Sequence, residues 1–197
     1  MMIIGLTGSI ASGKSTIGRV FHRYHFPVFD SDKAVHHLLG PKGAAVGDIV
    51  AQFGDCGTYE SGIDRKKLGS HVFANPEALS TLESILHPLV GQKRARFLQQ
   101  AKLARRRAII LDVPLLFETK TDLICDKTIL AMAPDRLIRQ RALARSGMTD
   151  DKLNGILAKQ MSQFEKAKLA DEIITTGLGH GAMMRDIHRL LSKWRLR

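Results

Sequence analysis

The segment 5–16 limits the fold of this chain more strongly than any other part of the sequence. It contains the P-loop pattern Gly-x-x-x-x-Gly-Lys-Ser, which begins at Gly8. The apolar, β-branched run over 1–7 predicts a buried strand before the pattern, and the apolar spacing over 16–24 predicts a helix after it. The pattern therefore lies between a strand and a helix start, which is the context that a phosphate-binding loop requires.

The residue types in this loop suit a phosphate site. Gly8 and Gly13 permit backbone conformations and close approaches that a side chain would block. The backbone amides would bind phosphate oxygens, and the dipole of the following helix would add positive potential. We expect Lys14 to reach the β- and γ-phosphates and Ser15 to hold Mg²⁺. The alternative is a glycine-rich turn that matches the pattern by chance.

The composition is that of a globular chain with one domain, or with a core and inserted subdomains. Its 197 residues and 44% hydrophobic content can form a sizeable core. No apolar run approaches the ~18 residues of a membrane span, and no basic leader precedes the first apolar run. Cys56 and Cys125 are far apart and have no metal-ligand spacing, which is typical of reduced thiols. We therefore expect a cytoplasmic protein without a membrane partner.

The net charge of +11 favours an anionic partner, although a soluble basic surface would also explain it. The basic residues are spread widely, with small clusters at 105–107 and 193–197. The sequence has no recognisable nucleic-acid motif, and Tyr and Trp are scarce. We therefore expect small phosphorylated substrates and no nucleic-acid partner.

The apolar patterns predict an α/β fold with five short parallel strands. The run at 108–113 is continuously apolar, as expected for a central parallel strand. The segment 32–104 has helical patterns and no good strand, and its length predicts an inserted helical subdomain. Within it, His87-Pro88 is expected to interrupt or kink a helix. The remaining strands are predicted at 1–7, 26–29, 127–131 and 172–176.

Carboxylates follow two of these strands. Asp30 and Asp32 come directly after the strand at 26–29, and Asp112 ends the strand at 108–113. Ligands of open α/β sheets bind beyond the carboxyl ends of strands, so these side chains are candidates for acid–base or metal chemistry. The alternatives are structural: Asp30 or Ser31 as a helix cap, and Asp112 as a strand-end cap.

An arginine-rich helix is predicted after the fourth strand. It begins at Pro134 and ends at Gly147, and Arg141 and Arg145 share one of its faces because they are four residues apart. A second helix reaches Met161, and a capping box starts a third. This helical hairpin is either a lid that closes over phosphates or a solvated basic face.

These features together describe a small-molecule kinase. A GTPase would need an Asn-Lys-x-Asp motif, which is absent, and motor ATPases usually carry a catalytic Glu where Pro114 follows the third strand. We expect a three-layer α/β/α P-loop kinase fold with a five-stranded parallel sheet. We place the nucleotide-binding core at 1–31, 105–133 and 170–197, the helical substrate subdomain at 32–104, and the helical lid at 134–169.

The sequence resembles the dephospho-CoA kinase family over nearly its whole length. The resemblance rests on these segments: Gly5 to Ser15, Asp30-Ser-Asp32, Ile63 to Leu68, Val72-Phe-Ala-Asn-Pro76, Leu86-His-Pro-Leu89, Asp112-Val-Pro-Leu-Leu-Phe-Glu118 and Ala170-Asp171.

The resemblance implies transfer of the ATP γ-phosphoryl group to the ribose 3′-hydroxyl of dephospho-CoA, with Mg²⁺, by a monomer. It implies that Asp32 is the general base. Arg141 and Arg145 match the family's lid arginines, and a structural role for His87 at the helix kink remains an alternative to ligand contact. The expected site residues are Asp32, Lys14 and Arg141 for catalysis; Gly8, Ala11, Ser12, Gly13, Lys14, Ser15, Thr16 and Arg145 for the nucleotide; Asp32, Arg65, His87 and Leu115 for dephospho-CoA; and Ser15 and Asp112 for the metal.

The chain departs from the family pattern at three places. Ser9 and Ala11 replace glycines of the loop, and Ser31 replaces an alanine; we expect these changes to be tolerated. The segment 175–177 replaces an Asp-Asn-x-Gly type of loop that is expected near the adenine ring, so the preference for ATP over GTP could be looser. Two other functions remain open: another P-loop small-molecule or nucleotide kinase, and a nucleic-acid-binding NTPase.

Overall fold

The computed structural model describes residues 1–72 and 75–196. The chain forms two compact units, one of Met1–Phe29 together with the chain from Ala101 onward, the other of Asp30–Gln100. The chain crosses between them inside β2 and inside α5. Residues 73 and 74, which belong to the family-like segment Val72-Phe-Ala-Asn-Pro76, lie outside the described residues. Among those that are described, no helix combines the length and apolar character needed to cross a bilayer.

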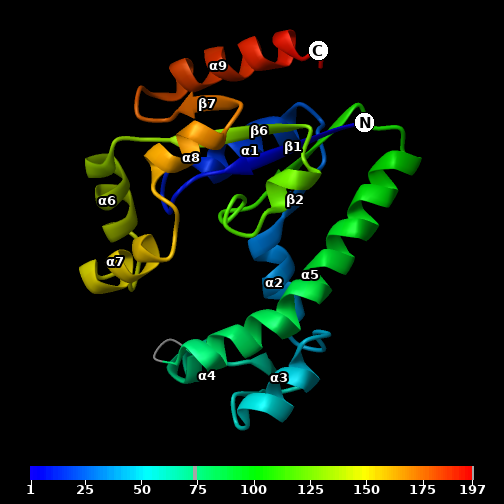
Figure 1. Cartoon of the computed structure of the whole chain (residues 1–197), viewed down its shortest axis with the longest axis vertical. Coiled ribbons are helices and arrows are strands. Elements are labelled where there is room, and N and C mark those ends of the chain that lie inside the picture. The colour runs from blue at the N-terminus through cyan, green and yellow to red at the C-terminus, as the bar shows by residue number, and fades with distance from the viewer. Residues whose placement is uncertain (73–74, 197) are drawn as a thin grey trace. The chain divides into compact units, whose positions relative to one another are not determined.

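The first unit contains the main sheet and most of the helices (Figure 1). Its strands are β1 (Met2–Thr7), β2 (Val28–Asp30, whose last residue opens the second unit), β5 (Ala108–Asp112), β6 (Lys127–Met132) and β7 (Glu172–Thr175). Its helices are α1 (Lys14–Arg23), η1 (Thr121–Ile124, a 3₁₀ turn), α6 (Asp135–Leu143), α7 (Asp150–Ala158), α8 (Gln163–Leu169) and α9 (His180–Lys193).

The five strands form one sheet in the order β2-β5-β1-β6-β7. Strand β1 pairs in parallel with both β5 and β6, and Leu6 lies opposite Asp112 in the register. Parallel strands of this kind are buried on both faces, which explains the continuous apolar run over β5. The predicted fold class, α/β with a five-stranded parallel sheet, is confirmed.

The core of this unit lies between the sheet and two helices. Ile4 and Leu6 of β1 pack with Ile17 and Phe21 of α1 and with Ile187 of α9, and all five side chains are fully buried. Burying one such side chain contributes about 1.5–3 kcal/mol relative to exposure. Helix α9 also lies along β7 (Figure 1). The core therefore fixes the sheet edge from which the glycine loop leaves β1.

The edge strand β7 is tied to β6 by Asp171. Its Oδ2 accepts hydrogen bonds from the backbone N–H and the hydroxyl of Thr128, both at 2.8 Å, and Lys127 Nζ lies 3.3 Å from its Oδ1. Burial alone would raise the pKa of Asp171, but these hydrogen bonds hold that pKa below its ordinary value. The Ala170-Asp171 pair thus anchors the last strand of the sheet.

The second unit has its own apolar core and a small hairpin. It contains α2 (Ser31–Leu39), α3 (Val46–Phe53), α4 (Arg65–Val72) and most of α5 (Pro76–Leu103). The expectation that this segment has no strand is wrong, because β3 (Gly57–Thr58) pairs with β4 (Gly62–Ile63). A Cβ at position 57 would lie 2.2 Å from the Gly62 carbonyl oxygen, so this close pairing requires glycine. Strands of two residues leave no periodic pattern that a sequence could reveal.

Helix α5 runs through Pro88 without a break, so the helix is not interrupted at His87-Pro88; the alternative, a kink there, stays a prediction. Proline inside a helix removes one backbone hydrogen bond and costs ~3 kcal/mol. Here Leu82 and Leu86 before the proline and Leu89 after it pack against the same apolar cluster. This packing on both sides offsets the lost hydrogen bond and keeps the helix continuous.

Candidate active site

The glycine loop between β1 and α1 has the shape of a phosphate cradle. Gly13, the N-cap of α1, has φ +95°, and a Cβ there would lie 2.9 Å from the side chain of Thr176. A Cβ at Gly8 would lie 2.5 Å from Ser12 Oγ. The amides of Lys14 and Ser15 lie in the first helical turn, where backbone N–H groups have no intrahelical acceptor. These amides and the helix dipole suit an anion.

Two details of the loop fit a site that a ligand completes. Ser12 is fully buried, and its Oγ has no hydrogen-bond partner within the described structure. An unsatisfied buried hydroxyl costs roughly 1–3 kcal/mol. Ala11 adopts φ +59°, a left-handed conformation that favours glycine, at a position where the family commonly has glycine. Strain of this kind persists where the surrounding structure requires one particular backbone shape.

Lys14 and Asp112 form an ion pair beside the loop. Their side chains are 12% and 5% exposed, so water screens the pair weakly. The parallel register brings them together, because Asp112 ends β5 opposite Leu6, just before the loop. The carboxylate therefore lies where a cation can bind, and the Lys14 ammonium is the cation that it holds here.

Thr176 joins the loop to the arginine-rich helix α6. Its hydroxyl donates to the Ser12 carbonyl oxygen. Arg141 donates to the Thr176 hydroxyl at 3.2 Å and to the Thr176 carbonyl at 3.1 Å. The sequence indicated Thr176 only as part of a loop near adenine, and no residue pattern signals this bridge. The predicted lid arginine Arg141 is thus linked to the phosphate loop through one residue.

Helix α6 ends at Leu143, so the prediction that it reaches Gly147 is wrong. The Arg145 N–H bonds the Ala142 carbonyl three residues back, and Gly147, with φ +73°, lies in the connection to α7. Arg145 is exposed beyond the helix end, so the argument that it shares a helical face with Arg141 does not apply. Helices α6 and α7 pack together (Figure 1).

The connection between α7 and α8 in the predicted lid also contacts the glycine loop. The Gln160 side-chain oxygen, just beyond α7, accepts from the Ile10 N–H at 3.2 Å. Sequence reasoning missed this contact, because a glutamine between two helices carries no recognisable signal. Three other predicted nucleotide and substrate residues make few contacts with the rest of the site. Ser15 is exposed, Thr16 Oγ1 accepts from Arg19 at 3.3 Å, and Leu115 is half-buried in the segment after β5.

The second unit holds three of the four predicted acceptor residues, Asp32, Arg65 and His87. Asp30 is the N-cap of α2 and accepts from the Lys33 N–H at 3.0 Å, which leaves Asp32 exposed in the first turn. One turn later on the same face lies His36, whose Nε2 accepts from Arg65 at 2.6 Å. A guanidinium can only donate, so His36 is the acceptor in this contact.

Sequence reasoning missed His36, although its four-residue spacing from Asp32 was a usable signal. The structure brings Arg65 to His36 and places Asp32 on the same helical face. His87 is exposed on α5.

The oxygen donors near the glycine loop suit a hard metal ion such as Mg²⁺. No group of three or more His, Cys, Asp or Glu side chains that could bind a metal occurs in the described parts of the chain. Asp112 and Ser15 offer one carboxylate and one hydroxyl, both hard oxygen donors. Mg²⁺ is commonly bound by one or two protein oxygens together with phosphate oxygens and water. The residues present therefore fit a nucleotide-bound Mg²⁺.

Comparison with known proteins decides the family. Residues 2–179 match the family model described as dephospho-CoA kinase. This chain belongs to the dephospho-CoA kinase family. A dephospho-CoA kinase from Rhodospirillum rubrum is 48% identical over 97% of this chain and 90% of its own length.

Solved structures agree with the dephospho-CoA kinase assignment. A crystal structure of a Thermus thermophilus protein is similar over 98% of this chain and 96% of that one, with a TM-score of 0.81 and 28% identity. A dephospho-CoA kinase from Campylobacter jejuni has a TM-score of 0.63 and 27% identity, over 98% and 96% of the two chains.

The Thr176 bridge gives a testable prediction for the nucleotide side. Thr176→Val keeps the side-chain shape but removes the hydroxyl that holds the Ser12 carbonyl and accepts from Arg141. Hydrogen bonds to charged groups contribute about 1.5–3 kcal/mol, so we expect the Kd for a non-hydrolysable ATP analogue to rise roughly tenfold or more. Titration calorimetry measures this. Thr176→Ser is the matched control that keeps the hydroxyl, and equal affinities of the two variants would contradict the bridge.

Proposed function

We propose that this chain transfers the γ-phosphoryl group of ATP to the ribose 3′-hydroxyl of dephospho-CoA, giving CoA and ADP in the last step of CoA biosynthesis. The observation that carries the proposal is the match to the dephospho-CoA kinase family over residues 2–179. The glycine loop with the adjacent Lys14–Asp112 pair supports it, because the family's reaction needs a site for the ATP phosphates.

The donor site would work by holding the triphosphate and stabilising its charge. The amides of the first helical turn and Lys14 would bind the β- and γ-phosphates. Arg141 donates to two neutral oxygens of Thr176, so its positive charge stays available to a phosphate. Gly8, Ala11, Ser12, Gly13 and Thr16 would shape the nucleotide site, and Arg145 and Leu115 keep their predicted ligand roles.

Asp32 would take the proton of the acceptor hydroxyl. It is exposed in the first turn of α2 and is not needed as the helix cap, since Asp30 has that role. A positioned base of this kind contributes typically ~10²–10⁴-fold to the rate. Arg65, held by His36, would bind phosphate groups of dephospho-CoA, and His87 remains a candidate for the same substrate.

Mg²⁺ would be held by Asp112 and Ser15 together with the nucleotide. When bound, it would neutralise charge on the ATP phosphates. Lys14 and Mg²⁺ would then share the attraction of the same carboxylate and phosphates. Two further expectations belong to this proposal, a monomer and a cytoplasmic location.

A comparison of possible phosphate acceptors, here called the acceptor panel, tests the function directly. Purified protein is given MgATP and either dephospho-CoA or one of a set of nucleosides and nucleotides, and ADP release is followed by a coupled assay. We expect turnover with dephospho-CoA well above the rest of the panel. Faster turnover with a nucleotide would favour another small-molecule kinase. Stimulation by polynucleotides that weakens with salt would favour a nucleic-acid-binding NTPase.

The role of Asp32 predicts a separation of catalysis from ATP binding. Asp32→Asn should lower kcat by roughly 10²–10⁴-fold, because the amide cannot accept the hydroxyl proton. Its affinity for an ATP analogue should stay unchanged, because the proposed partner of Asp32 is the acceptor hydroxyl and not the nucleotide. Asp30→Asn is the comparison, because it alters the cap and not the proposed base. A variant that loses ATP binding instead would make Asp32 a structural residue or metal ligand.

The His36–Arg65 contact predicts an effect on the acceptor alone. His36→Leu removes the acceptor of the Arg65 hydrogen bond, which is worth about 1 kcal/mol, so the KM for dephospho-CoA should rise roughly fivefold. The kcat and the KM for ATP should stay the same. His37→Leu is the matched control, because His37 is the next exposed residue on α2 and adjacent residues of a helix lie about 100° apart around its axis. An equal effect of both variants would rule out this positioning role.

A further inference from the structure

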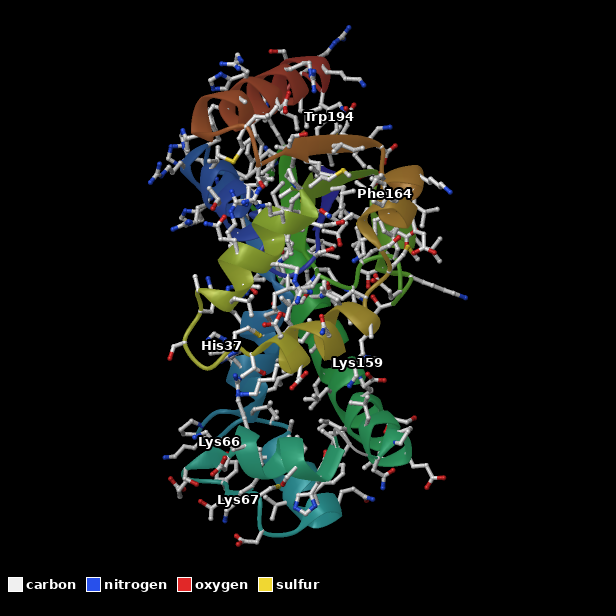
Figure 2. The ribbon with its side chains drawn as sticks, turned by 90° about the vertical axis from the view of Figure 1, so that its left-hand side faces the viewer. His37, Lys66, Lys67, Lys159, Phe164 and Trp194 are labelled. Carbon is white, nitrogen blue, oxygen red and sulfur yellow. The ribbon has the colours of Figure 1, made fainter. Side chains whose placement is uncertain are left out.

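Helix α8 (Gln163–Leu169) exposes apolar side chains and buries polar ones, which reverses the usual distribution. Phe164 and Leu169 are 66% and 55% exposed, and Figure 2 shows Phe164 on the outside of the molecule. Gln163 and Lys166, three residues apart on one face, are buried instead, and the Lys166 side chain is fully enclosed. Lysine is almost never fully buried unless it is paired. The inner face of α8 is therefore polar, and its contacts require an explanation.

Lys166 binds the segment that follows strand β5. Its Nζ donates to the Pro114 carbonyl oxygen at 2.7 Å and lies 3.0 Å from Glu118 Oε1. Pro114 is two residues beyond Asp112, the carboxylate that pairs with Lys14. The lysine thus holds both ends of the short segment 114–118 directly after the site carboxylate.

The Pro114 carbonyl has a second donor. The hydroxyl of Thr7, the last residue of β1, donates to it at 3.0 Å. Thr7 directly precedes Gly8, so this one oxygen links the start of the phosphate loop, the exit of β5 and helix α8. Val113 adds a backbone bond to Leu6 at 3.0 Å. The position of Asp112 relative to the loop is therefore fixed partly through Lys166.

The same inner face of α8 is linked to both ends of segment 134–160, the part of the predicted lid that precedes α8. Glu118 Oε1 accepts from the Met161 N–H at 2.8 Å, where the lid segment returns to the core. Gln163 holds the other end, because its side chain bonds the Ala133 N–H at 3.1 Å and the Ala133 carbonyl at 3.0 Å. Segment 134–160 is thus held at its two ends.

Stability alone is a weak reason for such a pair. Removing two charges from water costs several kcal/mol per ion, and replacing a buried ion pair by neutral residues of similar volume is often neutral or stabilising. Burial lowers the pKa of the Lys166 ammonium below its ordinary value, and the charge of Lys14 acts in the same direction, while Glu118 opposes both. The contact geometry, by contrast, serves the neighbouring site directly.

We propose that Lys166 and Glu118 are positioning residues for phosphoryl transfer, which hold the segment after Asp112 and the end of the lid in register with the phosphate loop. The inference rests on the proposed kinase function, because it is a statement about the rate of that reaction. Neither residue touches the reacting groups; they act through Pro114 and Met161.

The test uses a double variant that should fold. In Lys166→Met/Glu118→Gln the methionine fills the lysine volume and the glutamine oxygen still accepts from Met161, so no buried charge is left unpaired. We expect a melting temperature close to that of the wild type and a kcat about 10- to 100-fold lower, because a displacement of ~1 Å at a reacting group can cost 10²-fold. The KM for dephospho-CoA should change by less than the kcat, because only one predicted acceptor contact, Leu115, lies in the held segment, whereas the other three lie outside it.

Two comparisons separate positioning from folding. Lys168→Met alters an exposed lysine of the same helix and should leave both kcat and melting temperature unchanged. Lys166→Met alone leaves Glu118, which is 19% exposed and still accepts from Met161, and should also lower kcat more than it changes KM; it replaces the double variant if that protein fails to fold. A folded variant with the wild-type kcat, or a kcat that falls only with the folded fraction, would overturn the proposal.

The activity of the wild type with dephospho-CoA distinguishes failure of the proposed function from failure of the positioning role. If the wild type does not phosphorylate dephospho-CoA, the proposed function fails, and the variants are compared with whichever acceptor of the panel is turned over. If the wild type is active and the double variant equally so, the positioning role fails while the function stands.

Discussion

The parallel register of β1 between β5 and β6 is the constraint on which the site depends. It sets Leu6 opposite Asp112, so the glycine loop and the carboxylate leave the sheet at the same edge. The carboxyl ends of parallel strands are where α/β proteins bind ligands, since backbone amides of following helices and strand-end side chains converge there. A shift of one residue in β1 would turn Ile4 and Leu6 away from α1 and α9. Core packing therefore fixes the register of β1, and this register positions the glycine loop next to Asp112.

Charge is balanced around the loop before any ligand binds. Lys14 pairs with Asp112 and Lys166 with Glu118, each in surroundings that water screens weakly. An isolated ammonium this deep would cost several kcal/mol, so each lysine needs its carboxylate. In the proposed reaction the triphosphate oxygens would also bind Lys14, and Asp112 would face the Mg²⁺ of the nucleotide.

Much of the donor side could be predicted from the sequence, because its signals are local. The loop motif, the apolar strands and Asp112 at a strand end are short patterns, although a chance glycine turn and a strand-end cap were alternative interpretations. Lys166 could not be predicted, since α8 carries Phe164 and Leu169 and a periodicity argument would bury those residues. The reason for its burial, the Pro114 carbonyl, is 52 residues away along the chain. The unbroken passage of α5 through Pro88 also depends on packing that the sequence alone does not show.

The charges that remain unmatched by carboxylates point to where substrates bind. In the first unit, Arg141 is held by the hydroxyl and carbonyl of Thr176, which fix its position without cancelling its charge. In the second unit, Arg65 donates to the His36 ring, which carries no negative charge. A guanidinium oriented by acceptors without negative charge keeps its charge for a phosphate, whereas one paired with a carboxylate, such as Arg139 with Asp150, is already satisfied. Arg141 and Arg65 therefore fit the proposed reaction, in which both the donor and the acceptor carry phosphates.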